Sequence, residues 1–313
     1  MTTPLLAPQT SANPVRPPID FGWDRLDMWF VTQAGDRFEL SEWATGAFLM
    51  PGVTGMSMPK INHQTLSYAN AHGNVWNGLL IEPREVFWPL YLYNDETSQG
   101  YVDHIRAFWE ALSPFETVRW HVRDVTGTER YLDVRLKDDG GPGNDHDDVY
   151  YGWSKHRVVL EAHQPMWRSV VPIQRPFEES GGVKFFGPAG NNGPPFRPSR
   201  NSAAGTAALP NDGDLPAYVT WELVGPLNPA TLSHGGHVID VPFVINQGQT
   251  VVIDTNPESL TAFRNGVEIT ELMTGRFDAA PIPRKATTAL QVEYGGDGSI
   301  TASITPSYMR AYA

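Results

Sequence analysis

Residues 248–269 read GQTVVIDTNPESLTAFRNGVEI, and this stretch carries the pattern that decides the fold. An apolar run typical of a strand ends at Asp254, just before a Thr-Asn-Pro step. Asn265 and Gly266 follow one short strand later and are a strong signal for a two-residue hairpin turn, because both residues tolerate a positive φ. The stretch is therefore expected to form short strands joined by tight turns.

Asp254 has two interpretations, a catalytic carboxylate or a structural residue. Asp and Asn at strand ends accept hydrogen bonds from nearby backbone and stabilise the turn that follows. A catalytic carboxylate usually needs a partner that shares the chemistry, and the sequence supplies none at a recognisable spacing. We therefore assign Asp254, Asn265 and Gly266 to structural turns.

The rest of the C-terminal third repeats this pattern. Seven short strand-like segments fit into fewer than 100 residues, namely YVTWELV, HVIDVPFVI, TVVIDT, SLTAFR, VEIT, TALQVEY and SITASIT. Within the hairpin at Asn265, Ala262 is expected to face Ile269. This density of short strands predicts a β-sandwich over residues 217–313.

The first half of the chain also has strand patterns. Val118, Trp120 and Val122 alternate with polar residues, which indicates a half-buried antiparallel strand paired with YLDVRLKD at 131–138. Pro89 interrupts the strand-like run VFWPLYLY. Because proline has no N–H to donate to a ladder, this run is expected at a sheet edge or a bulge.

One helix is clear, so the expected fold class is mainly β with one helix. The helix is predicted to begin at Thr97 or Ser98, either of which can cap it, and to end before Pro114. Its expected buried face consists of apolar residues at helical spacing, namely Val102, Ile105, Trp109 and Leu112.

Length and composition divide the chain into four parts. Single cores stop growing near roughly 250–300 residues, so a chain of 313 residues suggests two domains. A stretch with eight Pro and seven Gly in 45 positions marks a connector between them. The expected parts are an N-terminal arm at 1–20, an N-terminal domain at 21–171, the connector at 172–216 and the C-terminal β-sandwich at 217–313.

Composition argues against several classes of function. The net charge of −12 and the lack of a Lys/Arg-rich cluster argue against wrapping nucleic acid, which depends on neutralising phosphates. The chain has no Cys, so it has no thiolate metal site and no Cys nucleophile. The first residues show no signal-peptide pattern, and no apolar run approaches about 20 residues.

Motifs for catalysis or metal binding are missing as well. His234 and His237 stand in SHGGH, but the two Gly between them make a flexible turn and no third ligand is evident. GGPGND at 140–145 matches only the start of a calcium-binding repeat and occurs once. The sequence has no GxSxG elbow and no Gly-rich phosphate loop. We therefore expect no cofactor, no metal and no enzymatic activity.

The order of these segments resembles the distal tail proteins of siphophages, the tail-hub family often labelled minor tail proteins. In the C-terminal third the likeness rests on NDGD at 211–214, the Gly-Pro and Asn-Pro turns at 225–229, the Asp-Thr step at 254–255, the Asn-Gly hairpin and Pro283. In the first half it rests on LSPFETVRWHVRDVTGTERYLDVRL and the closing VVLEAHQPMW. The likeness covers nearly the whole chain in order.

The resemblance implies a hexameric ring that serves as the hub between the tail tube and the tail tip of a long-tailed, non-contractile phage. A β-sandwich-like N-terminal domain would build the ring, and a galectin-like C-terminal β-sandwich would project outward. The implied partners are further copies of the chain, the tail tube protein, the tail-tip hub or tail-associated protein and the tape measure protein, at the distal end of the tail in the virion. DNA would pass through the lumen without specific binding, because like charge disfavours contact.

A ring needs strands that pair or pack across subunits, and the candidates for this interface are Pro89, Val118, Trp120 and Val122. The alternative function is a carbohydrate-binding adhesin of the tail tip, which would hold host surface glycans through exposed Trp or Tyr side chains of the C-terminal sandwich. A glycoside hydrolase, which needs two carboxylates about 5–10 Å apart, is a third hypothesis.

Overall fold

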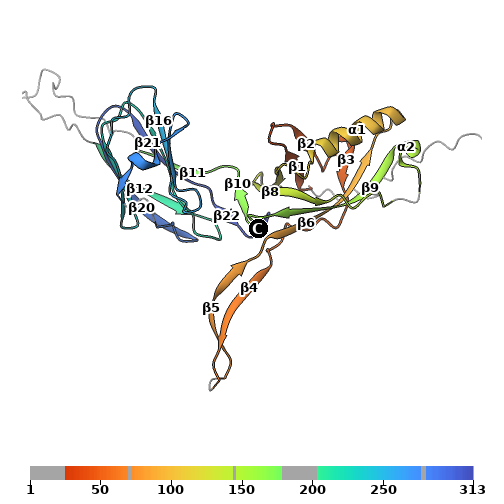
Figure 1. The fold of residues 1–313 in the computed structure, drawn as a ribbon, viewed down its shortest axis with the longest axis horizontal. Helices are drawn as coiled ribbons and strands as arrows, with labels where there is room; N and C mark the ends of the chain where they lie inside the picture. The colour runs from red at the N-terminus through yellow and green to blue at the C-terminus, as the bar shows by residue number, and fades with distance from the viewer. Residues whose placement is uncertain (1–24, 70–71, 144–145, 178–202, 276–279, 313) are drawn as a thin grey trace, which may run out of the picture. The chain divides into compact units, whose positions relative to one another are not determined.

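The computed structural model describes residues 25–69, 72–143, 146–177, 203–275 and 280–312. The chain forms two compact units, one of Met1–Trp167 with Met309–Ala313 and the other of Arg168–Tyr308. Figure 1 shows strands in both units and one long helix, α1, which confirms the mainly β fold class. The expected arm at 1–20 lies outside the described residues, as does the middle of the expected connector.

The chain up to its crossing into the second unit alternates short strands with few helical segments. These elements are β1 (Asp27–Val31), β2 (Arg37–Glu39), η1 (Trp43–Thr45), β3 (Ala47–Leu49), β4 (Ile61–Ser67), β5 (Asn74–Ile81), β6 (Arg84–Tyr93), α1 (Ser98–Ala111), β7 (Val118–Arg123), β8 (Glu129–Asp138), α2 (Asp148–Tyr151), β9 (Trp153–Ala162) and β10 (Trp167–Ser169).

One antiparallel sheet of order β2-β1-β7-β8-β9-β6-β3 encloses the core of the first unit. The two ends of this sheet meet, because the Leu49 N–H donates to the Leu40 carbonyl at 2.8 Å. Phe30 in β1 packs on Trp88 in β6 with ring centroids 6.1 Å apart, although three strands separate β1 from β6 in the sheet order. A single, nearly closed sheet thus provides both layers of the sandwich-like domain.

Helix α1 has the expected boundaries, and its buried face agrees only in part with the expected one. The Thr97 hydroxyl caps it by accepting the Gly100 N–H at 2.9 Å, and the helix ends at Ala111. Leu112, at the C-cap, is buried as expected, whereas Tyr101 and Phe108 are buried in place of Val102 and Trp109, which with Ile105 are half-buried. The aromatic Phe108 fits edge-on against Phe30, with ring centroids 5.6 Å apart, and this tertiary contact sets the rotation of the helix.

The second unit consists of strands with one helical turn. These elements are β11 (Ile173–Phe177), β12 (Ala203–Asn211), β13 (Thr220–Val224), β14 (Ala230–His234), β15 (His237–Val241), β16 (Thr250–Asp254), β17 (Thr261–Arg264), β18 (Val267–Glu268), η2 (Thr270–Leu272), β19 (Thr274–Gly275), β20 (Ala286–Tyr294), β21 (Ser299–Ile304) and β22 (Ser307–Tyr308).

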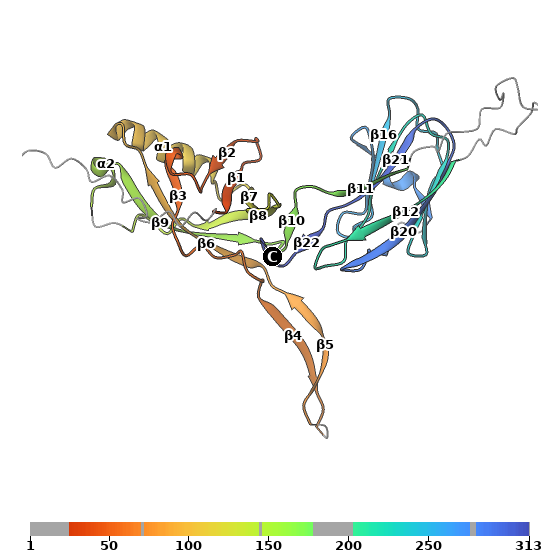
Figure 2. The same cartoon turned by 180° about the vertical axis from the view of Figure 1, so that it is seen from behind.

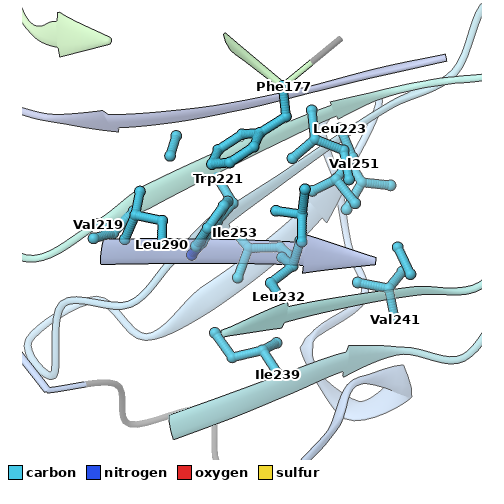
Figure 3. Close-up of a cluster of buried hydrophobic side chains, with 14 of the residues drawn as sticks. Phe177, Val219, Trp221, Leu223, Leu232, Ile239, Val241, Val251, Ile253 and Leu290 are labelled. Atoms are coloured by element: carbon cyan, nitrogen blue, oxygen red, sulfur yellow. The ribbon is translucent and has the colours of Figure 1, made fainter. Parts of the chain in front are cut away.

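The second unit is a β-sandwich, as the strand density predicts. One sheet has the order β11-β21-β13-β16-β17-β18 and the other the order β12-β20-β14-β15-β19. Their facing side chains form one core, in which Trp221 from the first sheet lies near Leu290 and Leu232 from the second (Figure 3). Trp221 is fully buried, which accounts for the period-two pattern of YVTWELV.

Two strands of this sandwich lie within the stretch expected to be a connector. Strands β11 and β12 each form the end of one sheet, so among the described strands each has a ladder partner on one side only. Pro176 and Pro210 fit at these positions, because a proline without N–H is tolerated at an edge strand. The Pro and Gly content that suggested a linker is therefore compatible with edge strands at both ends of 172–216.

The end of the chain returns to the first unit instead of completing the sandwich. The Ala311 N–H donates to the Met56 carbonyl at 2.9 Å. Arg130 Nη1 donates to the Arg310 carbonyl at 2.8 Å. These contacts place Met309–Ala313 in the first unit, whereas the sequence pattern assigned the stretch to the C-terminal domain.

Candidate assembly surface

The first unit carries a hairpin that no other described strand completes. Strands β4 and β5 pair only with each other, from Ile61 opposite Ile81 to Ser67 opposite Asn74. We call residues 61–81 the hairpin arm, and in Figures 1 and 2 it extends away from the sheet of its unit. The arm has no Asp, Glu, Lys or Arg over its whole length, in a chain that is 19% charged.

The described faces of the hairpin arm are exposed and partly apolar. Trp76 is 60% exposed and Leu80 57% exposed. The Trp76 indole N–H donates to His63 Nδ1 at 3.2 Å, so a cross-strand contact orients the ring. A two-stranded ribbon without a covering layer is at best marginally stable in water, and exposed apolar side chains of this size mark interaction sites. The hairpin arm is therefore a candidate interaction surface.

The base of the hairpin arm is firmly attached to the unit. Lys60 and Glu82 form an ion pair of 2.7 Å across the base, and the Glu82 N–H donates to the Lys60 carbonyl at 3.0 Å. Arg84 follows and is almost fully buried. The arm therefore departs from a fixed point in the sheet.

Arg84 forms a buried hub of hydrogen bonds to carbonyl groups. Its guanidinium donates to the carbonyls of Pro165 at 2.7 Å, Gly55 at 2.5 Å, Ser57 and Met309 at 2.9 Å. Burial lowers the pKa of Arg84 to about 10, so the group remains charged at neutral pH. The sequence analysis did not single out Arg84, because its carbonyl partners are backbone groups that no side-chain motif reveals.

The residues expected at the subunit interface have other positions. Val118, Trp120 and Val122 are buried in the core of the unit, and β7 pairs with β1 on one side and β8 on the other. The structure thus leaves these three side chains no surface for a neighbouring subunit, and β7 has no free edge. Their alternation reflects the inside of the curved sheet, which sequence periodicity cannot distinguish from an interface.

Pro89 lies in β6, next to a covering loop. Pro89 pairs with Arg157 of β9, and on its other side its carbonyl accepts the Met50 N–H at 2.8 Å. Strand β3 reaches only from Leu90 to Leu92 of β6, so the missing N–H of Pro89 falls where that ladder has ended. The edge expected from the proline is local, and the loop at Met50 occupies it.

The expected turn residues lie in the second unit and shape its loops. Asp254 ends β16, and its carboxylate accepts the Asn256 N–H at 3.0 Å and the Ser259 hydroxyl at 2.5 Å. Asn265 and Gly266 have φ of 47° and 82° and join β17 to β18. The register of this hairpin brings the Ile269 N–H to the Ala262 carbonyl at 2.7 Å.

Titratable groups in the described residues are used in local structure. His121 Nδ1 lies 2.8 Å from Glu129 Oε1, and burial lowers the pKa of His121. His234 Nε2 lies 3.0 Å from the Ala280 carbonyl, and burial lowers its pKa. Within the described ranges no three His, Cys, Asp or Glu side chains gather as metal ligands. No helix in these ranges is long and apolar enough to cross a membrane.

Comparison with solved structures reveals the same architecture in phage proteins. The crystal structure of the SPP1 Dit protein matches with a TM-score of 0.59 over 90% of this chain and 98% of that chain, at 13% identity. The chain shares the fold of this phage protein. The SPP1 Dit protein is described as a paradigm of the hub adsorption apparatus in phages that infect Gram-positive bacteria.

Two structures of the phage p2 baseplate in its activated conformation match over the same shares of the two chains. The structure with Ca gives a TM-score of 0.55 at 11% identity, and that with Sr gives 0.56 at 10%. No protein-family model and no curated protein match the chain. At these identities the comparisons establish the fold, and at that level the resemblance to phage tail-hub proteins is confirmed.

Proposed function

We propose that this protein is a structural component of a phage virion, a distal tail protein that joins the tail tube to the tail tip of a long-tailed, non-contractile phage. The observation that carries the proposal is the fold shared along 90% of the chain with the hub protein of SPP1. A likeness that extends over both units argues for a common architecture of the whole protein, beyond one recurring domain.

The hairpin arm supports a ring of copies, six in number by the resemblance to distal tail proteins. Packing on a neighbouring copy would remove Trp76 and Leu80 from water and offer hydrogen-bond partners to the free edges of β4 and β5. In a ring each copy gives one arm and receives one, so the contact closes without leaving an exposed arm. The lack of charge along residues 61–81 lowers the cost of burying the arm.

The other partners in this proposal are the tail tube protein, the tail-tip hub or tail-associated protein and the tape measure protein. The net charge of −12 supports a lumen through which DNA slides without binding, because phosphates and carboxylates repel each other. If Lys substitutions of acidic residues that line the ring leave DNA ejection unchanged, this part of the proposal fails.

The adhesin alternative stays a prediction. Within the described part of the second unit, Phe263 is moderately exposed, whereas Phe243 lies under the guanidinium of Arg264 at 4.2 Å. Among the described residues of this unit, Phe263 is therefore the aromatic side chain most open to sugar stacking. Binding of the full chain to a glycan array, lost on Phe263→Ser, would support the alternative.

The mass of the purified protein tests self-assembly. A ring of six corresponds to about six times 34.7 kDa, roughly 208 kDa, by native mass spectrometry or light scattering. The double variant Trp76→Ser, Leu80→Ser should shift the population to monomer. The control is Phe115→Ser, which changes an exposed side chain in the loop after α1 and should leave the mass unchanged. A wild-type chain that is monomeric up to high concentration, together with no antibody labelling at the tail end of virions, would contradict the proposal.

A further inference from the structure

A continuous band of aromatic rings covers the outer face of β3, β6 and β9. We call this set the aromatic band, and it consists of Phe48, Trp43, Tyr93, Tyr91, Trp153, His146, Tyr151 and Tyr150. From Phe48 to Tyr150, successive ring centroids are 4.0–5.5 Å apart. The band lies on the face of β6 opposite Leu90 and Leu92. Its middle rings, Tyr91 and Tyr93, are nearly buried, and the rings on either side of them are half-buried or exposed.

Strand register brings the band together. Phe48 pairs with Tyr91 across β3 and β6, and Tyr93 pairs with Trp153 across β6 and β9. Directly paired residues share one face of a sheet, so these four rings stand side by side. Trp43, from the turn η1, stacks on Tyr91 and Tyr93 with centroids 5.5 and 4.8 Å away.

The far end of the aromatic band is exposed and held on a rigid turn. Tyr150 is 78% exposed and Tyr151 is 53% exposed. The Asp147 carboxylate caps this turn by accepting the Tyr150 N–H at 3.2 Å, and the Asn94 N–H donates to the Gly152 carbonyl at 2.9 Å. Two exposed Tyr side chains on a fixed backbone lose little freedom on binding, and such residues are enriched at interfaces.

The described chain begins at the other end of the band. The guanidinium carbon of Arg25 lies 5.9 Å from the ring centroid of Phe48. Arg25, the residue that follows 1–24 in the sequence, therefore lies beside the band, and residues 1–24 contain five Pro. Pro-rich segments favour the extended polyproline II conformation, and aromatic-lined surfaces are the sites that recognise it.

Length and charge also fit. At about 3.1 Å per residue, some ten residues of polyproline II helix span six ring-to-ring steps of 4.0–5.5 Å, well within the 24 available. Asp95 lies close enough to the band to raise the pKa of Tyr93, after burial as the larger cause. A negative field of this kind suits Arg16, which stands directly before Pro17 and Pro18.

We propose that the aromatic band is the docking site for residues 1–24 of the same chain, with the Pro-rich segment running from Arg25 toward Tyr150. The covalent link at Arg25 gives the segment an effective concentration on the order of millimolar at the band, so weak intrinsic affinity suffices for occupancy. The face of β3, β6 and β9 is thereby covered by the protein's own N-terminal segment.

Hydrogen–deuterium exchange on the full chain tests this proposal. The first variant starts at Arg25, and the second is full-length with Pro14, Pro17 and Pro18 changed to Ala. In both variants the backbone amides of 43–48 and 146–153 should exchange faster than in the unchanged protein. The amides of β20 and β21 should exchange at the same rate in all three proteins. A synthetic peptide of residues 1–24, added to the variant that starts at Arg25, should restore the protection. Tyr150→Ser and Tyr151→Ser should each weaken peptide binding about tenfold, whereas Phe115→Ser, at a ring that is 89% exposed outside the band, should not.

Three results would overturn the proposal. The first is identical exchange in the full-length protein and both variants. The second is protection that disappears on dilution, because the segment would then cover the band of a neighbouring copy. The third is binding of soluble oligosaccharides that depends on Tyr150 while the peptide fails to bind, which would make the band a glycan platform.

Discussion

Replacing Arg84 with Met removes the cation that binds four backbone carbonyls of the first unit. The change leaves the buried carbonyls of Gly55, Ser57, Pro165 and Met309 without their donor. Each unpaired buried group costs about 1–3 kcal/mol, and relief from burying a charge offsets part of the sum. We expect a loss of about 3–5 kcal/mol in the free energy of unfolding of this unit.

Denaturation in guanidinium chloride, followed by Trp fluorescence, measures this loss. If the free energy of unfolding falls by about 4 kcal/mol per molar of guanidinium chloride, the unfolding midpoint of the first unit should fall by about 1 M. The midpoint of the second unit should not change, because the two units have separate cores. Arg106→Met is the matched control, since that side chain is 72% exposed and should change stability by less than about 0.5 kcal/mol. Equal midpoints for wild type and Arg84→Met would refute the reasoning.

Three further predictions concern the β-sandwich and the buried histidines. Trp221→Ala should destabilise the second unit by about 3–5 kcal/mol, because this ring is fully buried, and a denaturation curve in which only the first unit's transition moves would contradict it. Gly266→Val should cost about 1–3 kcal/mol, since φ is 82° at this position, and an unchanged melting temperature would count against the turn. Burial lowers the pKa of His121, His156 and His234 below 6.5, so the unfolded chain binds more protons than the folded chain in mild acid. The free energy of unfolding should therefore fall as the pH is lowered from about 7.5 to about 5. An equally steep fall in a variant with all three His changed to Gln would show that these groups are not the cause.

Several expectations from local patterns were close to the structure. The alternation at Val118, Trp120 and Val122 predicts a strand, and β7 spans Val118–Arg123. The cap at Thr97 and the boundary before Pro114 follow from side-chain chemistry within a few residues. These signals could be found because each depends on neighbours in the sequence.

Other features depend on contacts between distant parts of the chain. The hairpin arm consists of ordinary strand residues, and that no third strand of the described chain pairs with it depends on the whole topology. The four carbonyl partners of Arg84 come from three separate regions of the chain, at residues 55–57, 165 and 309. Backbone acceptors carry no sequence signature, so no pattern could have assigned this role.

The sequence by itself determined the elements of this protein: where strands alternate, where turns need Asn or Gly, and where one helix begins. The tertiary structure alone decided which face of each strand is enclosed, that β11 and β12 belong to the sandwich, and that the last residues return to the first unit. The physical reason is that turn and strand preferences are local free energies, whereas enclosure of a face depends on which distant segments cover it.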